Sequence, residues 1–169
     1  MPTTITVTNP DATILDSLVA ALLAARISGA AAFQSAEACI SEQQAVESAC
    51  TGSAPRAAMW YMGTEETTGV DNQRNCVLSA RLYLYGRGTA ALDKTSAVRE
   101  ALRLVNAAKN AIEAAPPALA VGCGDNEVYH EPLRWGKPVL SNADDNGAHW
   151  VSAQVDLSVG YVLASPTSH

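Results

Sequence analysis

Large aromatic side chains are scarce in this sequence. It contains a single Phe, and Phe, Trp and Tyr together make up 5% of its residues, although 48% of the residues are hydrophobic. Much of that hydrophobic content is alanine, so we expect a core built from small side chains together with leucine and valine. With 169 residues the chain is long enough for one domain, which we place over residues 1–169 with its core at about 10–163.

Paired cysteines are also missing. The four cysteines, Cys39, Cys50, Cys76 and Cys123, form no CxxC pair and no regular framework. This spacing favours free thiols in a reducing compartment over a secreted domain held by disulfides.

The sequence has no excess of positive charge. Eleven Lys and Arg face seventeen Asp and Glu, which gives a formal net charge of -6. Because affinity for nucleic acids depends mainly on Lys and Arg, this balance excludes a surface built to grip phosphates. It is compatible with a protein that lets DNA pass without binding it.

Long apolar runs and a basic leader are absent as well. The opening MPTTITVTNPDA has no basic region, so we expect no signal peptide. The apolar run at 14–25 contains Asp16 and Ser17, and it is too short to span a bilayer. We therefore expect a soluble protein without a membrane partner, made in a cytoplasm.

Two helices stand out in the sequence. Asn9, Pro10 and Asp11 form a helix start, and the pattern predicts a helix that ends near Gly29. Helical spacing over 94–114 predicts a second helix, closed by Pro116-Pro117. Its apolar stripe is predicted to be Val98, Ala101, Leu102, Val105, Ala108 and Ile112.

Three segments predict strands. Residues 56–63 are rich in aromatic and apolar residues, and residues 76–88 alternate with a period of two. Residues 151–161 alternate most regularly, with apolar side chains on one face and polar ones on the other. We therefore predict an α+β fold in which an antiparallel β-sheet is flanked by two main helices.

Two segments fit this plan less well. Residues 30–54 are compatible with a short helix or with an irregular pair of strands. Residues 116–149 indicate short strands and an extended loop, because Gly, Pro, Asn and Asp are frequent there. We interpret 30–54 and 116–149 as insertions or long loops.

The segment GCGDNEVYHEP contains the residues most suggestive of catalysis. Cys123 and His130 would be a nucleophile and its base, with Asp125 and Glu131 nearby. No strand–turn–helix elbow surrounds the cysteine, however, and catalytic partners are usually neighbours in space rather than in sequence. A polar loop with one small buried thiol is the favoured interpretation.

The other motifs also favour structural explanations. Asp144, Asp145 and His149 include metal-ligating residue types, but no second ligand cluster accompanies them, and NADDNG is typical of a turn before a strand. The GCG and GRG motifs lack the spacing of phosphate or dinucleotide loops. We therefore predict no catalytic, cofactor or metal site, and no enzyme.

The order of these elements resembles one family. A helical N-terminus leads to PRAAMWYMGTEETTG, then to RNCVLSARLYLYGRGTAALDKTSAVREALRLV, and the chain closes with DDNGAHWVSAQVDLSVGYVL. Over roughly residues 10–30 and 55–163 this order resembles the tail terminator, or tail completion, proteins of long non-contractile bacteriophage tails. The segments 30–54 and 116–143 are longer than that compact fold requires.

The resemblance implies a structural virion protein at the head-proximal end of the tail, assembled in the host cytoplasm. Members of the family form a hexameric ring on the last ring of the tail tube, stop its growth, and meet the head-completion or neck proteins. DNA passes through the lumen of such a ring without specific binding. An acidic lumen that repels DNA is a hypothesis based on the charge of -6.

The resemblance also directs attention to exposed polar and aromatic residues as candidate subunit or partner contacts. For Trp150 a place in the core or as a plug at the sheet end is an equal alternative. The candidates are Arg81, Tyr83, Tyr85, Asp144, Asp145, Trp150, Gln154 and Asp156.

Two other functions compete with this one. Another head–tail connector or neck adaptor would share the compartment and the ring, but many such proteins are mostly helical. A small α+β enzyme or ligand-binding domain would use Cys123 and His130, and predicts a concave pocket and a hyperreactive thiol.

Overall fold

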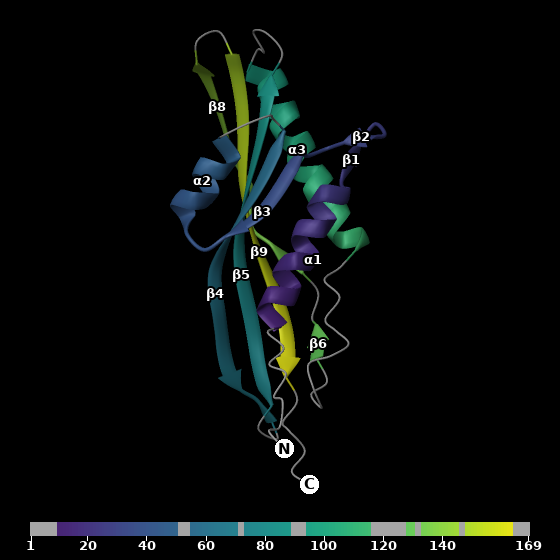
Figure 1. Ribbon diagram of the computed structural model, residues 1–169, viewed down its shortest axis with the longest axis vertical. Helices are drawn as coiled ribbons and strands as arrows, with labels where there is room; N and C mark the ends of the chain where they lie inside the picture. Colours follow the sequence, from purple (N-terminus) through teal and green to yellow (C-terminus); the bar gives the residue numbers. More distant parts are fainter. Residues whose placement is uncertain are drawn as a thin grey trace, which may run out of the picture.

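Two long antiparallel strands form the centre of the molecule: β5 (Arg74–Gly88) and β9 (Ala148–Leu163). In the computed structural model they pair along their whole length and extend over most of the molecule (Figure 1). The structure describes residues 10–50, 55–70, 73–88, 94–115, 128–130, 133–145 and 148–163. The helices are α1 (Pro10–Ala24), α2 (Glu42–Cys50) and α3 (Lys94–Ala114). The other strands are β1 (Arg26–Ile27), β2 (Ala30–Ala31), β3 (Ser35–Cys39), β4 (Arg56–Thr68), β6 (Val128–His130), β7 (Arg134–Trp135) and β8 (Val139–Asp145).

The main sheet has the order β3-β4-β5-β9-β6, and β7 and β8 also pair with β9. The three short strands β6, β7 and β8 follow one another along the same edge of β9. β3 pairs with β4 in parallel, whereas the remaining pairs are antiparallel. The sheet is therefore mixed, and the prediction of a purely antiparallel sheet is corrected at this one pair. The α+β class is confirmed.

One face of the sheet carries the main core, and we call it the inner face. Alternate residues of β5 and β9 point there, and α1 and α3 cover them. The strict alternation predicted for residues 151–161 is confirmed, since every second residue from Val151 to Tyr161 is buried. The largest fully buried side chains include Phe33, Ile14, Leu18, Leu22, Leu78, Leu82, Leu104 and Leu157.

The opposite, outer face carries a third helix. α2 packs there through a small cluster made of Cys39, Ala45, Ala49, Ala58 and Tyr83. Both β3 and α2 come from residues 30–54, so this segment supplies one edge strand of the sheet and part of its outer layer. The prediction of two main flanking helices omits α2. Figure 1 shows α2 on one side of the sheet and α1 with α3 on the other.

The first helix ends earlier than its glycine signal predicts. α1 stops at Ala24, and Gly29, with φ 83°, lies instead in the turn between β1 and β2. Arg26 terminates the helix, because its guanidinium donates to the carbonyl oxygens of Leu23 and Ala25 at 3.1 and 3.0 Å. The bond to Leu23 satisfies a carbonyl group that a helix end leaves without an intrahelical partner, and the carbonyl of Ala25 also accepts from the backbone N–H of Ala32 at 2.9 Å.

The apolar stripe of α3 is rotated relative to the prediction. Leu104 is fully buried, but Val98 and Leu102 are 46% and 37% exposed. An apolar stripe on a helix is wide, and helical spacing alone does not show which of its two edges packs against the sheet. In α3 the edge with Leu104 packs against the inner face, and the edge with Val98 and Leu102 stays exposed.

The acidic pair Asp144 and Asp145 lies at the end of β8 and does not form a turn. Asp144 pairs with His149, and Asp145 pairs with Ala148. Only Asn146-Gly147 separates the two strands in the sequence, and this dipeptide favours two-residue hairpins. The predicted turn over 142–147 is therefore wrong for its first four residues, which belong to β8.

A candidate protein interface on the outer face of the sheet

The outer face brings together six of the eight predicted contact residues. Arg81, Tyr83 and Tyr85 alternate along β5, and the register places Asp156 opposite Arg81 and Gln154 opposite Tyr83. Trp150 joins them from the start of β9. Their role as contacts with other subunits or partners stays a prediction.

Arg81 is the centre of this group. Its Nε donates to Asp156 Oδ1 at 2.6 Å, and its Nη2 donates to Asp156 Oδ2 at 3.2 Å. Glu42 of α2 lies 3.7 Å from Nη1, and the guanidinium lies 6.0 Å from the centre of the Trp60 ring. The bonds to Asp156 raise the pKa of Arg81, so it stays charged. One guanidinium thus connects β4, β5, β9 and α2.

Tyr83 is not exposed, contrary to its predicted role as a surface contact. It is only 6% exposed and packs beneath α2. Its hydroxyl donates to Glu42 Oε1 at 2.6 Å. Burial, together with Glu42, raises the pKa of Tyr83. Its position indicates that Tyr83 holds α2 against the sheet.

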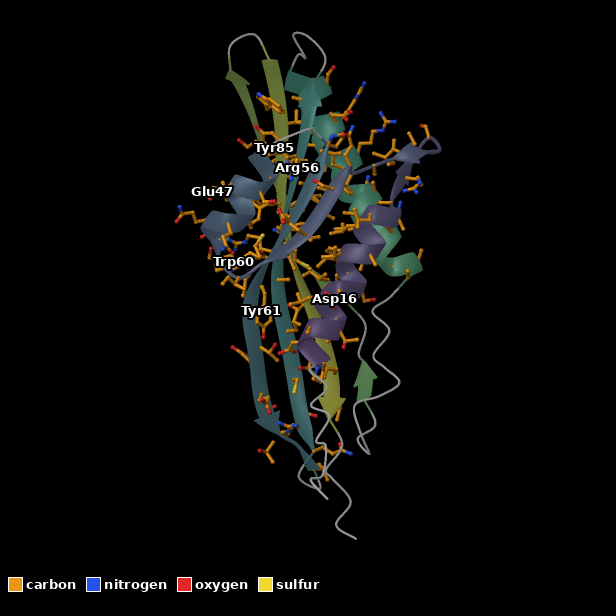
Figure 2. All side chains as sticks on the ribbon, viewed as in Figure 1. Asp16, Glu47, Arg56, Trp60, Tyr61 and Tyr85 are labelled. Carbon is orange, nitrogen blue, oxygen red and sulfur yellow. The ribbon has the colours of Figure 1, made fainter. Side chains whose placement is uncertain are left out.

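Tyr85 and Trp150 form an aromatic pair beside α2. Their ring centres are 4.9 Å apart with planes inclined at 28°, and both residues are half-buried. Trp150 therefore lies on the outer face and does not belong to the core beneath α1 and α3. A small cavity of about 100 Å³ lies next to the pair, lined by Val46 and Ala49 of α2 and by Tyr85, Ser152 and Gln154 of the sheet, among others. Figure 2 shows Tyr85 and Trp60 flanking α2.

We call Trp60, Arg81, Tyr85, Trp150, Gln154 and Asp156 the outer strip. Sequence reasoning missed Trp60, although it lies in a predicted strand. The register pairs Trp60 with Arg81, but no sequence signal fixes which residues of two strands face each other. Asp144 and Asp145 lie in β8, and their side chains, with that of His149, are outside the described part of the structure.

A second polar cluster, also missed, joins α1 to the inner face. Asp11 accepts hydrogen bonds from the hydroxyls of Tyr61, at 3.0 Å, and Tyr161. Tyr61 also bonds Thr64 at 2.9 Å across a β-bulge that includes Gly63, whose φ of 116° favours glycine. Burial first, and then Asp11, raise the pKa of Tyr161 well above its usual range. The cluster fixes the start of α1 to β4 and β9.

The described residues give little support for catalysis. Cys39 and Cys76 are buried free thiols, and burial raises the pKa of each, which disfavours the reactive thiolate. Cys123 lies outside the described residues, and His130 is described only as a backbone position in β6. Over the described ranges, no group of three His, Cys, Asp or Glu side chains is arranged to hold a metal ion.

No helix in the described part of the chain is both long and apolar enough to cross a membrane. The sequence matches no protein-family model and has no significant match among curated proteins.

Proposed function

We propose that this protein is a structural virion subunit, a ring-forming tail terminator. It caps the tail tube, stops tube growth and joins the tail to the head-completion or neck proteins. The resemblance in element order supports this proposal, and so does the α+β arrangement of long paired strands with helices on the sheet.

The observation that carries the proposal is the outer strip. One face of the sheet is closed by α1 and α3, whereas α2 covers only part of the other. Around α2 this face carries two tryptophans, a tyrosine and an arginine, all of them half-buried, and these residue types dominate binding energy in protein interfaces. Because these side chains are held by a stack and by a two-point ion pair, they lose little conformational freedom on binding. This arrangement favours a protein contact over a small-molecule site.

The first experiment measures assembly. The purified protein is examined by light scattering and negative-stain imaging, and we expect rings of about six subunits with a central hole, as the resemblance implies. A chain that stays monomeric and never binds a tail tube contradicts the proposal.

The second experiment measures function directly. The protein is added to tail tube protein during polymerisation, and we expect shorter tubes with one capped end. A Trp150→Ala variant is expected to cap less well while keeping its fold, since Trp150 lies outside the main core. Leu157→Ala, a core change, serves as the comparison and is expected to lower the melting temperature instead. If the wild type and Trp150→Ala cap tubes equally well, the outer strip is not part of the interface.

A further inference from the structure

α3 presents an exposed basic groove on the side of the molecule away from α2. Arg26, Arg99, Leu102 and Arg103 line a shallow groove of about 510 Å³ between α3 and β1, and we call it the arginine groove. Arg99 has no ion pair within the described ranges, and Arg103 lies 3.9 Å from Glu100. Four of the eleven Lys and Arg of this acidic chain belong to α3, which also contains Glu100 and Glu113, so the groove lies on a helix of net positive charge.

The groove is also apolar at its border. Val98 and Leu102 are 46% and 37% exposed on the same helix, although a helical stripe would normally place such side chains inside. Exposed apolar residues beside exposed positive charge are typical of a surface that binds a partner carrying apolar and negatively charged side chains.

α2 has the complementary characters on the opposite side of the molecule. Ile40, two residues before α2, and Val46 within it are 83% and 41% exposed, and Glu47, which accepts a hydrogen bond from Gln43 at 2.8 Å, is exposed as well. We call these three residues the α2 face. Residues 27–55 contain Glu37, Glu42 and Glu47 and no Lys or Arg. Figure 2 shows Glu47 projecting away from the body, and Figure 1 places α2 on the side opposite α3 and the β1–β2 hairpin.

We propose that the α2 face of one copy docks into the arginine groove of the next copy. Glu47 then pairs with Arg99 and Arg103, while Val46 and Ile40 cover Leu102 and Val98. The sheet separates the two surfaces within one molecule, so the contact forms only between molecules. This inference rests on the proposed function, for which it supplies the contact between subunits.

The positions of the two surfaces determine the kind of assembly. Because the surfaces differ and lie on opposite sides of the subunit, the contact is head-to-tail, and repetition produces a closed ring or a helical filament. A nucleic-acid occupant fits less well, since three arginines on a chain of net charge -6 neutralise few phosphates.

The first test reverses the charge of each surface. Arg99→Glu with Arg103→Glu reverses the groove, and Glu47→Arg reverses the α2 face. Sedimentation velocity at low salt is expected to show self-association weakened by at least about tenfold in each variant, because like charges then meet. Lys137→Glu and Glu65→Arg are the matched controls, since both residues are exposed and lie outside the two surfaces. Circular dichroism confirms that every variant is folded.

The decisive test mixes the two reversed variants. In an alternating assembly each reversed groove meets a reversed α2 face, and each normal groove meets a normal one. The mixture is therefore expected to assemble although neither variant does alone, and the wild-type assembly is expected to weaken as salt rises.

Three outcomes overturn the inference. If rings form and the reversed variants assemble as well as the controls, this contact is wrong while the proposed function stands. If the reversed variants lose assembly but their mixture does not regain it, the two surfaces do not meet each other. A wild-type chain that remains monomeric at every concentration, and on the tail tube, overturns both proposals.

Discussion

Asp156 shows how much a single residue contributes on the outer face. Asp156→Asn keeps the shape of the side chain but removes the charge that Arg81 holds at two points. Because Asp156 is half-exposed, we expect a loss of only about 1 kcal/mol in the free energy of unfolding, measured by urea denaturation. Asp16→Asn on α1 is the control, since Asp16 is exposed and has no ion pair in the described part of the chain. Equal losses in both variants contradict this account of Arg81.

Tyr161 links stability to alkaline pH. Its pKa is raised in the folded state by burial and by Asp11, so the fold favours the neutral phenol. This contribution is complete below the unfolded pKa of about 10 and is lost as pH rises beyond it. We expect the melting temperature of the wild type to fall above about pH 10.

Tyr161→Phe tests this account. The variant is expected to lose about 1–2 kcal/mol at neutral pH, because Asp11 loses one donor. The melting temperature of the variant is also expected to fall less steeply than that of the wild type above about pH 10, because the variant lacks the ionisation of Tyr161. A slope identical to that of the wild type places the alkaline sensitivity elsewhere, for example in Tyr83 or Cys76, whose pKa values are also raised.

At the scale of elements, we expect α2 to be the least stable of the three described helices. It has 9 residues and packs on a cluster of mostly small side chains, whereas α3 has 21 and borders the main core. Helices this short are marginal without tertiary contacts. We therefore expect the backbone amides of α2 to exchange hydrogen faster than those of α3. Tyr83→Phe removes the hydrogen bond to Glu42 and is expected to increase the exchange rate of the α2 amides further. Tyr61→Phe is the matched control and should leave α2 unchanged.

Elements with strong local signals could be predicted from the sequence. Pro10 opens α1, and α3 covers 94–114 as its periodicity indicates. The segment 30–54 could not be assigned, because β3 depends on a parallel partner, and a short helix such as α2 depends on a distant sheet. Local sequence carries neither piece of information.

The candidate site was predictable to the same extent. Alternation placed Arg81 and Tyr85 on one face of their strand and Asp156 on the polar face of another strand, because a strand's period is local. Only the register shows that both belong to the same face of the sheet. Alternation did not predict that Tyr83 is buried, because the burial comes from α2, whose Glu42 accepts the hydrogen bond of Tyr83 from 41 positions earlier. It also missed Asp11, whose tyrosine partners lie 50 and 150 positions away.

At the scale of the whole molecule, charge predicts indifference to DNA. The protein has a net charge of -6, and in the proposed assembly α2 of a neighbouring copy would also cover the arginines of the groove, so little positive surface is left for DNA. We expect fluorescence anisotropy at physiological salt to show duplex DNA binding weaker than a Kd of about 10⁻⁴ M, the weak end of non-specific binding. Tighter binding would indicate a basic surface that DNA can reach, and it would contradict the hypothesis of an acidic lumen that repels DNA.

The place of β9 in the sheet has a consequence for synthesis. β9 lies between β5 and the three short strands, yet it is the last of the described strands to leave the ribosome. Until it emerges, β5 keeps a long open edge, and β6, β7 and β8 have no partner. Exposed edges of this kind invite aggregation. We therefore expect nascent chains to need protection by chaperones until β9 has emerged, and chains that end before β9 to be degraded.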